Sequence, residues 1–103
     1  MAREQRQLVN PVRDLFDAAV RHYAVRLTCR FCRRQRLLPS AALWWHFSRR
    51  HIPDWLRDVP KKCVCRECGR RDPALDLVHE EPNDSSLPLP SEQDWKRELS
   101  RRR

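Results

Sequence analysis

Hydrophobic residues near the N-terminus recur at spacings of three and four positions. The dipeptide before them is Asn10-Pro11; asparagine is a favoured N-cap, and proline suits the first helical position. The pattern therefore predicts a helix from Pro11 to about Tyr23, with one apolar stripe that packs on a core. The residues of this stripe are Val12, Leu15, Phe16, Ala19, Val20 and Tyr23.

Short apolar runs further along predict four strands in two pairs. Residues 24–29 and 33–38 form the first predicted hairpin, and residues 61–65 and 74–79 form the second. Apolar residues alternate with polar ones in the last of these strands, which is typical of a sheet with one covered face. Cysteine pairs lie at the tips of both predicted hairpins.

A helical segment separates the two hairpins. Pro39-Ser40 begins it, with Ser40 as the predicted cap. Leu43 and Phe47 are four residues apart and mark its apolar side, and Pro53 ends it because proline cannot continue a helix. A short helical turn follows before the second cysteine group.

The cysteine pairs have the spacing of a metal site. Cys29 and Cys32 form one C-x-x-C unit, and Cys65 and Cys68 form the other. Two such units in a short chain are typical of four thiolates around one zinc ion, since the spacing lets a tight turn aim two sulfurs at one point. Gly69, the only glycine, follows where such a turn requires a positive φ. We therefore predict one structural Zn2+ bound by these four residues.

The predicted fold is a small α+β zinc ribbon. Its two β-hairpin knuckles enclose the helical insertion, and a helix lies at each end of the chain. The fifth cysteine, Cys63, forms a C-x-C unit with Cys65, which is a poorer chelating turn. We expect Cys63 to be a small core residue or an exposed thiol near the metal.

Size and composition are consistent with a domain that needs a metal. Of the 103 residues, 40% are hydrophobic and 35% are charged, so the core is thin and a staple is expected. Five cysteines could indicate a secreted disulfide framework. The two C-x-x-C units, the odd number and the charged N-terminus favour a reducing cytoplasm instead. No apolar run approaches ~18 residues, so we expect no membrane span.

No group of residues indicates catalysis. One glycine in the chain excludes a glycine-rich phosphate loop, and no serine lies in a nucleophile-elbow sequence. Four cysteine ligands also leave a zinc ion no open position for a substrate. We therefore expect that the protein is not an enzyme.

The charge is positive and unevenly distributed. The formal net charge is +8, and about +6 once a zinc ion and four thiolates are counted. Residues 1–36 carry +6, residues 61–72 carry +3, residues 73–94 carry −6 and residues 95–103 carry +4. A basic balance of this kind favours nucleic acid, anionic surfaces or acidic partners.

The acidic segment contains a predicted linker. Residues 80–90 are rich in proline and acidic side chains, a composition that cannot make a packed core. They predict an extended, flexible linker between a zinc-ribbon domain of residues 1–79 and a basic helix of residues 91–103. Ser91 caps that helix, with Asp94 at the capping-box position.

Several basic and aromatic side chains have two interpretations. Arginines that flank the knuckles can stabilise a zinc tetrathiolate, whose charge is about −2, or contact phosphates, because six exceed what that charge needs. Trp45 and Trp95 can be structural, or exposed and able to stack on a base or contact a partner. Trp95 and Leu99 form a small apolar face on the last helix. The arginines are Arg30, Arg33, Arg34, Arg66, Arg70 and Arg71.

Three segments carry a resemblance to a known family: residues 43–47 (LWWHF), 65–71 (CRECGRR) and 87–97 (LPLPSEQDWKR). They resemble short, uncharacterised zinc-ribbon proteins of alphaproteobacteria that have a double C-x-x-C motif. The resemblance covers most of the chain after about Ala24, and Cys63 departs from the family's pattern. It implies the same four zinc ligands and a bacterial cytoplasm.

The leading hypothesis from the sequence is a non-enzymatic zinc-binding module that binds nucleic acid through an arginine-rich face. The alternative is a protein-interaction adaptor whose C-terminal helix docks on a larger partner through Trp95 and Leu99. A third hypothesis is a thiol sensor that uses Cys63. Steep salt dependence distinguishes phosphate binding from apolar docking.

Overall fold

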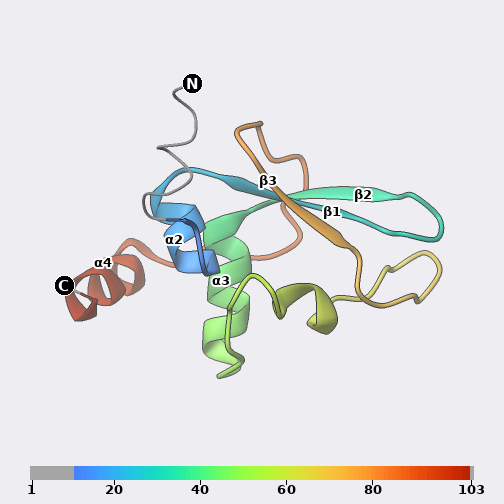
Figure 1. The fold of residues 1–103 in the computed structure, drawn as a ribbon. Coiled ribbons are helices and arrows are strands. Elements are labelled where there is room, and N and C mark those ends of the chain that lie inside the picture. The colour runs from blue at the N-terminus through green and yellow to red at the C-terminus, as the bar shows by residue number, and fades with distance from the viewer. Residues whose placement is uncertain (1–10, 103) are drawn as a thin grey trace.

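The computed structural model describes residues 11–102 and has a small α+β fold with a three-stranded antiparallel sheet (Figure 1). No helix in this part of the chain is both long and apolar enough to cross a membrane. The elements are α2 (Leu15–Val20), β1 (Ala24–Thr28), β2 (Gln35–Pro39), α3 (Ser40–Arg49), the 3₁₀ helix η1 (Val59–Lys62), β3 (Ala74–Val78) and α4 (Glu92–Arg101).

The sheet has the order β2-β1-β3, with β1 in the centre. Val25 of β1 lies opposite Leu38 of β2 and Leu77 of β3, so apolar residues meet across both pairs. The predicted first hairpin is confirmed to within two residues. The tip of this hairpin extends beyond the helices (Figure 1).

The predicted second hairpin is wrong. Residues 61–65 do not form a strand: η1 occupies their first part, and only Val64 and Arg71 form an isolated bridge. Asp72 then takes a positive φ of 62°, which turns the chain away from that bridge. β3 pairs with β1 instead, where Leu75 and Leu77 pack against the core.

The helix starts show how local capping competes with the apolar pattern. α2 begins at Leu15 rather than Pro11, because the Asp14 carboxylate accepts the Asp17 N–H at 2.8 Å. The predicted cap Asn10 lies outside the described residues. Ser40 does not cap α3 but is its first residue, and its hydroxyl donates to the Tyr23 carbonyl at 2.7 Å.

The core lies between the helices and one face of the sheet. α2 and α3 pack against each other at the end of the sheet opposite the hairpin tip (Figure 1). The apolar stripe predicted for the first helix is partly confirmed, since Val20 is exposed and Ala18 is buried. The buried cluster consists of Leu15, Phe16, Val25, Leu27, Leu38, Leu43, Trp44, Phe47 and Val59.

The C-terminal helix is part of this core. Trp95 lies with its ring centroid 4.6 Å from that of Phe16 and 5.6 Å from that of Trp44, and Leu99 also packs against the cluster. Of the two interpretations that the sequence left open for Trp95, the structure has the structural one, and Leu99 shares it. A Trp–Leu pair four residues apart covers a domain's own core as readily as a partner's surface.

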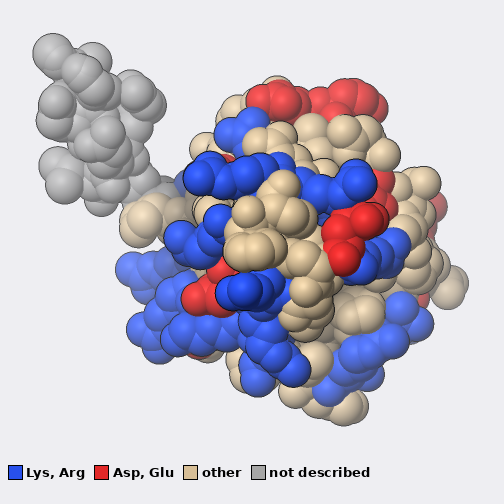
Figure 2. All heavy atoms as spheres, turned by 90° about the vertical axis from the view of Figure 1, so that its right-hand side faces the viewer, with Lys and Arg blue, Asp and Glu red and all other residues tan. Residues whose placement is uncertain are grey.

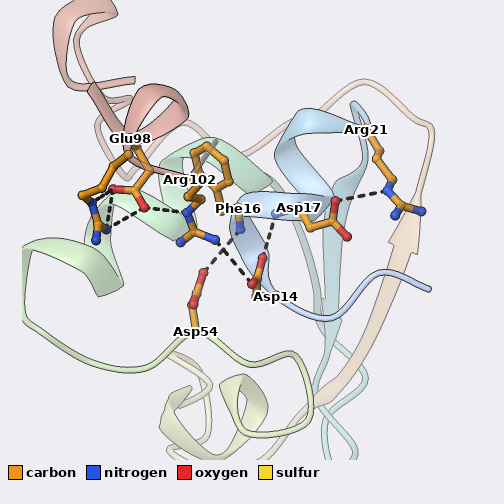
Figure 3. Close-up of polar contacts among 8 residues, drawn as sticks. Asp14, Phe16, Asp17, Arg21, Asp54, Glu98 and Arg102 are labelled. Carbon is orange, nitrogen blue, oxygen red and sulfur yellow. Dashed lines mark hydrogen bonds and ion pairs between the residues drawn. The ribbon is translucent and has the colours of Figure 1, made fainter. Parts of the chain in front are cut away.

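Charged groups secure α4 at the same place (Figure 3). Glu98 is 7% exposed and accepts hydrogen bonds from Arg101 and Arg102. Burial raises the pKa of Glu98, but these two arginines outweigh it and lower the pKa below its usual value. Arg102 also lies 4.3 Å from the Phe16 ring and 3.6 Å from the Asp14 carboxylate. α4 is thus attached to α2 by apolar packing and by ion pairs.

The segment before α4 is extended, as its composition predicts, and it contacts the edge of β2. The N–H groups of Asn83 and Asp84 each lie 3.0 Å from the Leu37 carbonyl oxygen, to which they donate. Asp84 pairs with Arg36 at 2.6 Å. Burial raises the pKa of Asp84, but hydrogen bonds from Ser86 and Arg36 lower it to about 2. The division into domain, linker and helix stays a prediction.

Replacing Trp95 by alanine should lower the free energy of unfolding by about 2–3 kcal/mol, because the ring fills space between Phe16 and Trp44. Chemical denaturation of the metal-loaded chain measures the change. Leu89→Ala is the control, since Leu89 is 62% exposed and its loss should cost less than about 0.5 kcal/mol. Equal stability of the Trp95→Ala and Leu89→Ala variants would contradict the packed position of α4.

Candidate metal centre

The four predicted ligands lie together. The sulfur atoms of Cys29, Cys32, Cys65 and Cys68 are all within 4.8 Å of one another. The closest pairs are Cys29–Cys68 at 3.5 Å and Cys32–Cys65 at 3.6 Å. Four sulfurs at the corners of a tetrahedron around a zinc-sized ion lie about 3.8 Å apart, given metal–sulfur bonds of about 2.3 Å. These side chains can therefore coordinate one metal ion.

The sheet brings the two cysteine pairs together. Cys29 and Cys32 lie in the turn between β1 and β2, whereas Cys65 and Cys68 precede β3. Because β3 is antiparallel to β1, with Thr28 opposite Ala74, the start of β3 lies beside the end of β1. Both cysteine turns therefore reach the same end of the molecule (Figure 1).

The first knuckle is closed by its own backbone. The Cys29 N–H donates to the Arg34 carbonyl at 2.8 Å, and the Arg33 N–H donates to the Cys29 carbonyl at 3.0 Å. Arg33 has a φ of 67°, a left-handed conformation that costs a residue with a Cβ atom free energy.

The second knuckle repeats this geometry. The Cys65 N–H donates to the Arg70 carbonyl at 2.8 Å, and the Gly69 N–H donates to the Cys65 carbonyl at 2.8 Å. Gly69 takes the position that Arg33 has in the first knuckle, with a φ of 76°. The predicted positive φ of Gly69 is confirmed. The two knuckles thus differ in which residue takes the left-handed position.

Backbone N–H groups point at the first sulfur of each pair. The N–H groups of Cys32 and Phe31 lie 3.4 Å from the Cys29 sulfur, and they lower the pKa of Cys29 to about 6. At Cys65 the N–H groups three and two positions further along lower the pKa in the same way. In each pair the backbone therefore favours the thiolate form of the first cysteine.

The second cysteine of each pair is affected in the opposite direction. The backbone N–H of Arg34 lowers the pKa of Cys32, but burial and the neighbouring sulfurs raise it to about 11. At Cys68 the Arg70 N–H lowers the pKa, but burial and the neighbouring sulfurs outweigh it and raise the pKa. Four adjacent sulfurs thus become thiolates together only when a cation balances their charge, which is what a metal ion supplies.

Cys63 lies outside this group of four. It is half-buried, packs against the core, and its thiol donates to the Val59 carbonyl at 3.3 Å. Burial raises the pKa of Cys63. Cys63 therefore has the position of a small core residue, one of the two roles that its spacing suggested.

The six arginines of the knuckles are all exposed. Figure 2 views the molecule from this end, where Lys and Arg side chains cover much of the surface and acidic side chains form smaller patches. The Arg30 Nε donates to the Asp72 carbonyl at 2.9 Å, and Arg34 lies 3.7 Å from the Glu67 carboxylate. Arg66 lies 3.4 Å from the Ser86 hydroxyl. Nucleic-acid contact by Arg30, Arg33, Arg34, Arg66, Arg70 and Arg71 stays a prediction.

The predicted partner-binding residues lie away from the metal centre, among the helices. Trp45 is half-buried against Trp44, with ring centroids 5.7 Å apart, and the Arg49 guanidinium lies 5.3 Å from its ring. Trp95 and Leu99 contact the core on α4. Partner binding through these three residues stays a prediction, but none of them is a freely exposed side chain.

An exposed aromatic residue beside the cysteine cluster was not predicted from the sequence. Phe31, between Cys29 and Cys32, is 62% exposed, and the Arg70 guanidinium lies 4.2 Å from its ring centroid. Its position between Cys29 and Cys32 could have indicated this exposure, because a side chain between the two ligands of such a turn does not pack against the core.

Comparisons with protein-family models, with curated proteins and with solved structures gave no match. The resemblance to alphaproteobacterial zinc-ribbon proteins therefore stays a prediction. The function has to be inferred from the cysteine cluster and the side chains around it.

Serine in place of Cys29, Cys32, Cys65 or Cys68 should abolish stoichiometric metal binding, because each removes one of four ligands. Cys63→Ser is the matched control and should keep the metal and the fold. Elemental analysis and circular dichroism of the purified variants measure both. Equal metal loss in the Cys63 and Cys65 variants would mean that the wrong thiol has been assigned to the centre.

Glycine at position 33 should stabilise the first knuckle by up to about 1 kcal/mol, because it removes the strain of a positive φ. Gly69→Ala should cost about 1 kcal/mol through backbone strain alone, since a Cβ atom there would meet nothing within 4 Å. Denaturant unfolding of the metal-loaded variants measures both. A change of the same sign in the two variants would contradict the equivalence of Arg33 and Gly69.

Proposed function

We propose that this protein is a non-enzymatic zinc-binding module that binds nucleic acid through the arginine-rich face of its two knuckles. The observation that supports the proposal most is the position of the six arginines. They come from two separate segments of the chain, yet all flank one cysteine cluster, and all are exposed.

Zinc is the proposed metal because of the donor set. Four thiolates in tetrahedral arrangement suit Zn2+ or an iron–sulfur site, and two C-x-x-C turns are typical of structural zinc. Four protein ligands fill the coordination shell, so the metal would hold the two knuckles together and leave no place for a substrate. Its free energy of binding would support the end of the sheet that the core does not reach.

The charges around the cluster favour an anionic ligand. A zinc tetrathiolate carries about −2, which six guanidinium groups exceed. The pair between Arg34 and Glu67 is exposed, with a separation of 3.7 Å, and such pairs contribute little. Arg36 is different, because Asp84 neutralises it at 2.6 Å. The arginines of the knuckles are thus available for phosphates, whereas Arg36 is not.

The adaptor hypothesis is less well supported. It needs an exposed apolar face on α4, but Trp95 and Leu99 pack against the core. The thiol-sensor hypothesis needs a reactive thiolate, but burial raises the pKa of Cys63 and its thiol is hydrogen-bonded to Val59. Nucleic-acid binding is therefore the function that we put forward.

Binding to a labelled oligonucleotide should weaken as salt rises, because each phosphate contact releases counterions. Fluorescence anisotropy between 50 and 500 mM salt (a range of about one decade) gives the slope of log K against log salt. The double variant Arg33→Gln/Arg71→Gln should reduce the magnitude of that slope by about 2.

Arg97→Gln is the control for the loss of a charge. Arg97 is an exposed arginine on α4, at the far end of the molecule from the knuckles, and its replacement should leave the slope unchanged. If Arg97→Gln reduced the slope as much as the double variant Arg33→Gln/Arg71→Gln, the knuckle arginines would not be the phosphate-binding surface. If the wild-type protein does not bind at 50 mM salt or below, a range in which phosphate contacts are strongest, the proposed function is wrong.

A further inference from the structure

Phe31 has an unusual position for a large apolar side chain. It is 62% exposed at the tip of the first knuckle, although the domain has few hydrophobic residues with which to build its core. It lies between two arginines of the same segment, Arg30 and Arg33 being its near neighbours. An exposed aromatic ring among basic side chains suggests a ligand with both flat apolar groups and negative charge.

The ring is also held in place. The Phe31 N–H lies 3.4 Å from the sulfur of Cys29, so the backbone of Phe31 is fixed by the metal-binding turn itself. Arg70, from the other knuckle, places its guanidinium 4.2 Å from the ring centroid. An arginine that stacks on an aromatic ring orients it and keeps its own charge near the surface.

Nucleobases are the flat groups that such a ring can stack on, while the neighbouring arginines reach the backbone phosphates. Bases within a duplex are already stacked on one another, so an exposed ring adds affinity only for unpaired bases. We propose that Phe31 and Arg70 form a stacking platform for an unpaired base, and that the nucleic acid bound by this protein is single-stranded. This inference rests on the proposed function and specifies its ligand.

A protein partner is the other class of ligand that an exposed phenylalanine can serve. The surroundings favour nucleic acid, because all six knuckle arginines are exposed at the same end as Phe31. The phosphate backbone of a single strand matches this charge, and its bases match the ring.

The test uses the full-length, zinc-loaded chain and fluorescence anisotropy at about 100 mM salt, where the Debye length is about 10 Å. The probes are a labelled mixed-sequence single strand, as DNA and as RNA, and the duplex of the same sequence. Phe31→Ala should weaken single-strand binding by about 5- to 100-fold, from the loss of one stacked base. Duplex binding should change by less than about twofold, because phosphate contacts dominate it.

Two further variants separate stacking from other effects. Phe31→Tyr should bind the single strand as well as the wild type does, since it keeps an aromatic face. Leu89→Ala should leave both affinities unchanged, because Leu89 has the same exposure of 62% and lies outside the knuckles. Zinc content should be equal in all variants, which shows that the metal centre is intact.

The outcomes distinguish this inference from the proposed function. Phe31→Ala could weaken single-strand and duplex binding equally, or could leave both unchanged. In either case the stacking platform is wrong while nucleic-acid binding stands. The same holds if the wild type prefers the duplex. If the wild type binds none of these probes at 100 mM or at lower salt, both proposals are wrong. A protein ligand for Phe31 is then the hypothesis that remains.

Discussion

The meeting of four cysteine sulfurs beside the β1–β3 pair is the constraint on which this structure depends most. Leu27 is the member of the buried cluster nearest the tip of the β1–β2 hairpin, and that tip extends beyond the helices (Figure 1). The second knuckle lies outside the three-stranded sheet, and the residues that flank it form an isolated bridge between Val64 and Arg71. A shared metal ion would tie both turns to one point and replace the missing core.

The opposite end of the molecule is held in a different way. There α4 adds Trp95 and Leu99 to the core and surrounds the buried Glu98 with Arg101 and Arg102. Apolar packing and ion pairs therefore stabilise the helical end, whereas ligand bonds would stabilise the knuckle end. This separation leaves the arginines at the knuckles free of a structural role in the core, so they can serve a charged ligand.

The sequence predicted the features that arise from local chemistry. The C-x-x-C spacing identified the cysteine cluster, Gly69 marked a turn with positive φ, and Ser91 with Asp94 marked the start of α4. β1 and β2 followed from a short hairpin pattern, in which the partner strand is a neighbour in the chain.

The pattern was wrong about one strand pairing, and it left alternatives open where a residue's partner is distant in the sequence. The alternation of apolar and polar residues in β3 fits any antiparallel neighbour, so the pattern did not specify β1 as the strand that pairs with it. Trp95 and Leu99 have the same spacing whether they cover their own core or another protein. The start of α2 was missed for a local reason: Asp14, four residues after Asn10, is an equally good cap and accepts the Asp17 N–H.

X-ray absorption spectroscopy of the purified, metal-loaded protein tests the central claim most directly. A zinc edge with four sulfur ligands at about 2.3 Å, and one zinc per chain, is the expected result. A shell that mixes sulfur with nitrogen or oxygen would contradict the assignment of Cys29, Cys32, Cys65 and Cys68 as the complete ligand set. Absence of bound metal from a protein that is nevertheless folded would contradict the account of the knuckle end as a whole.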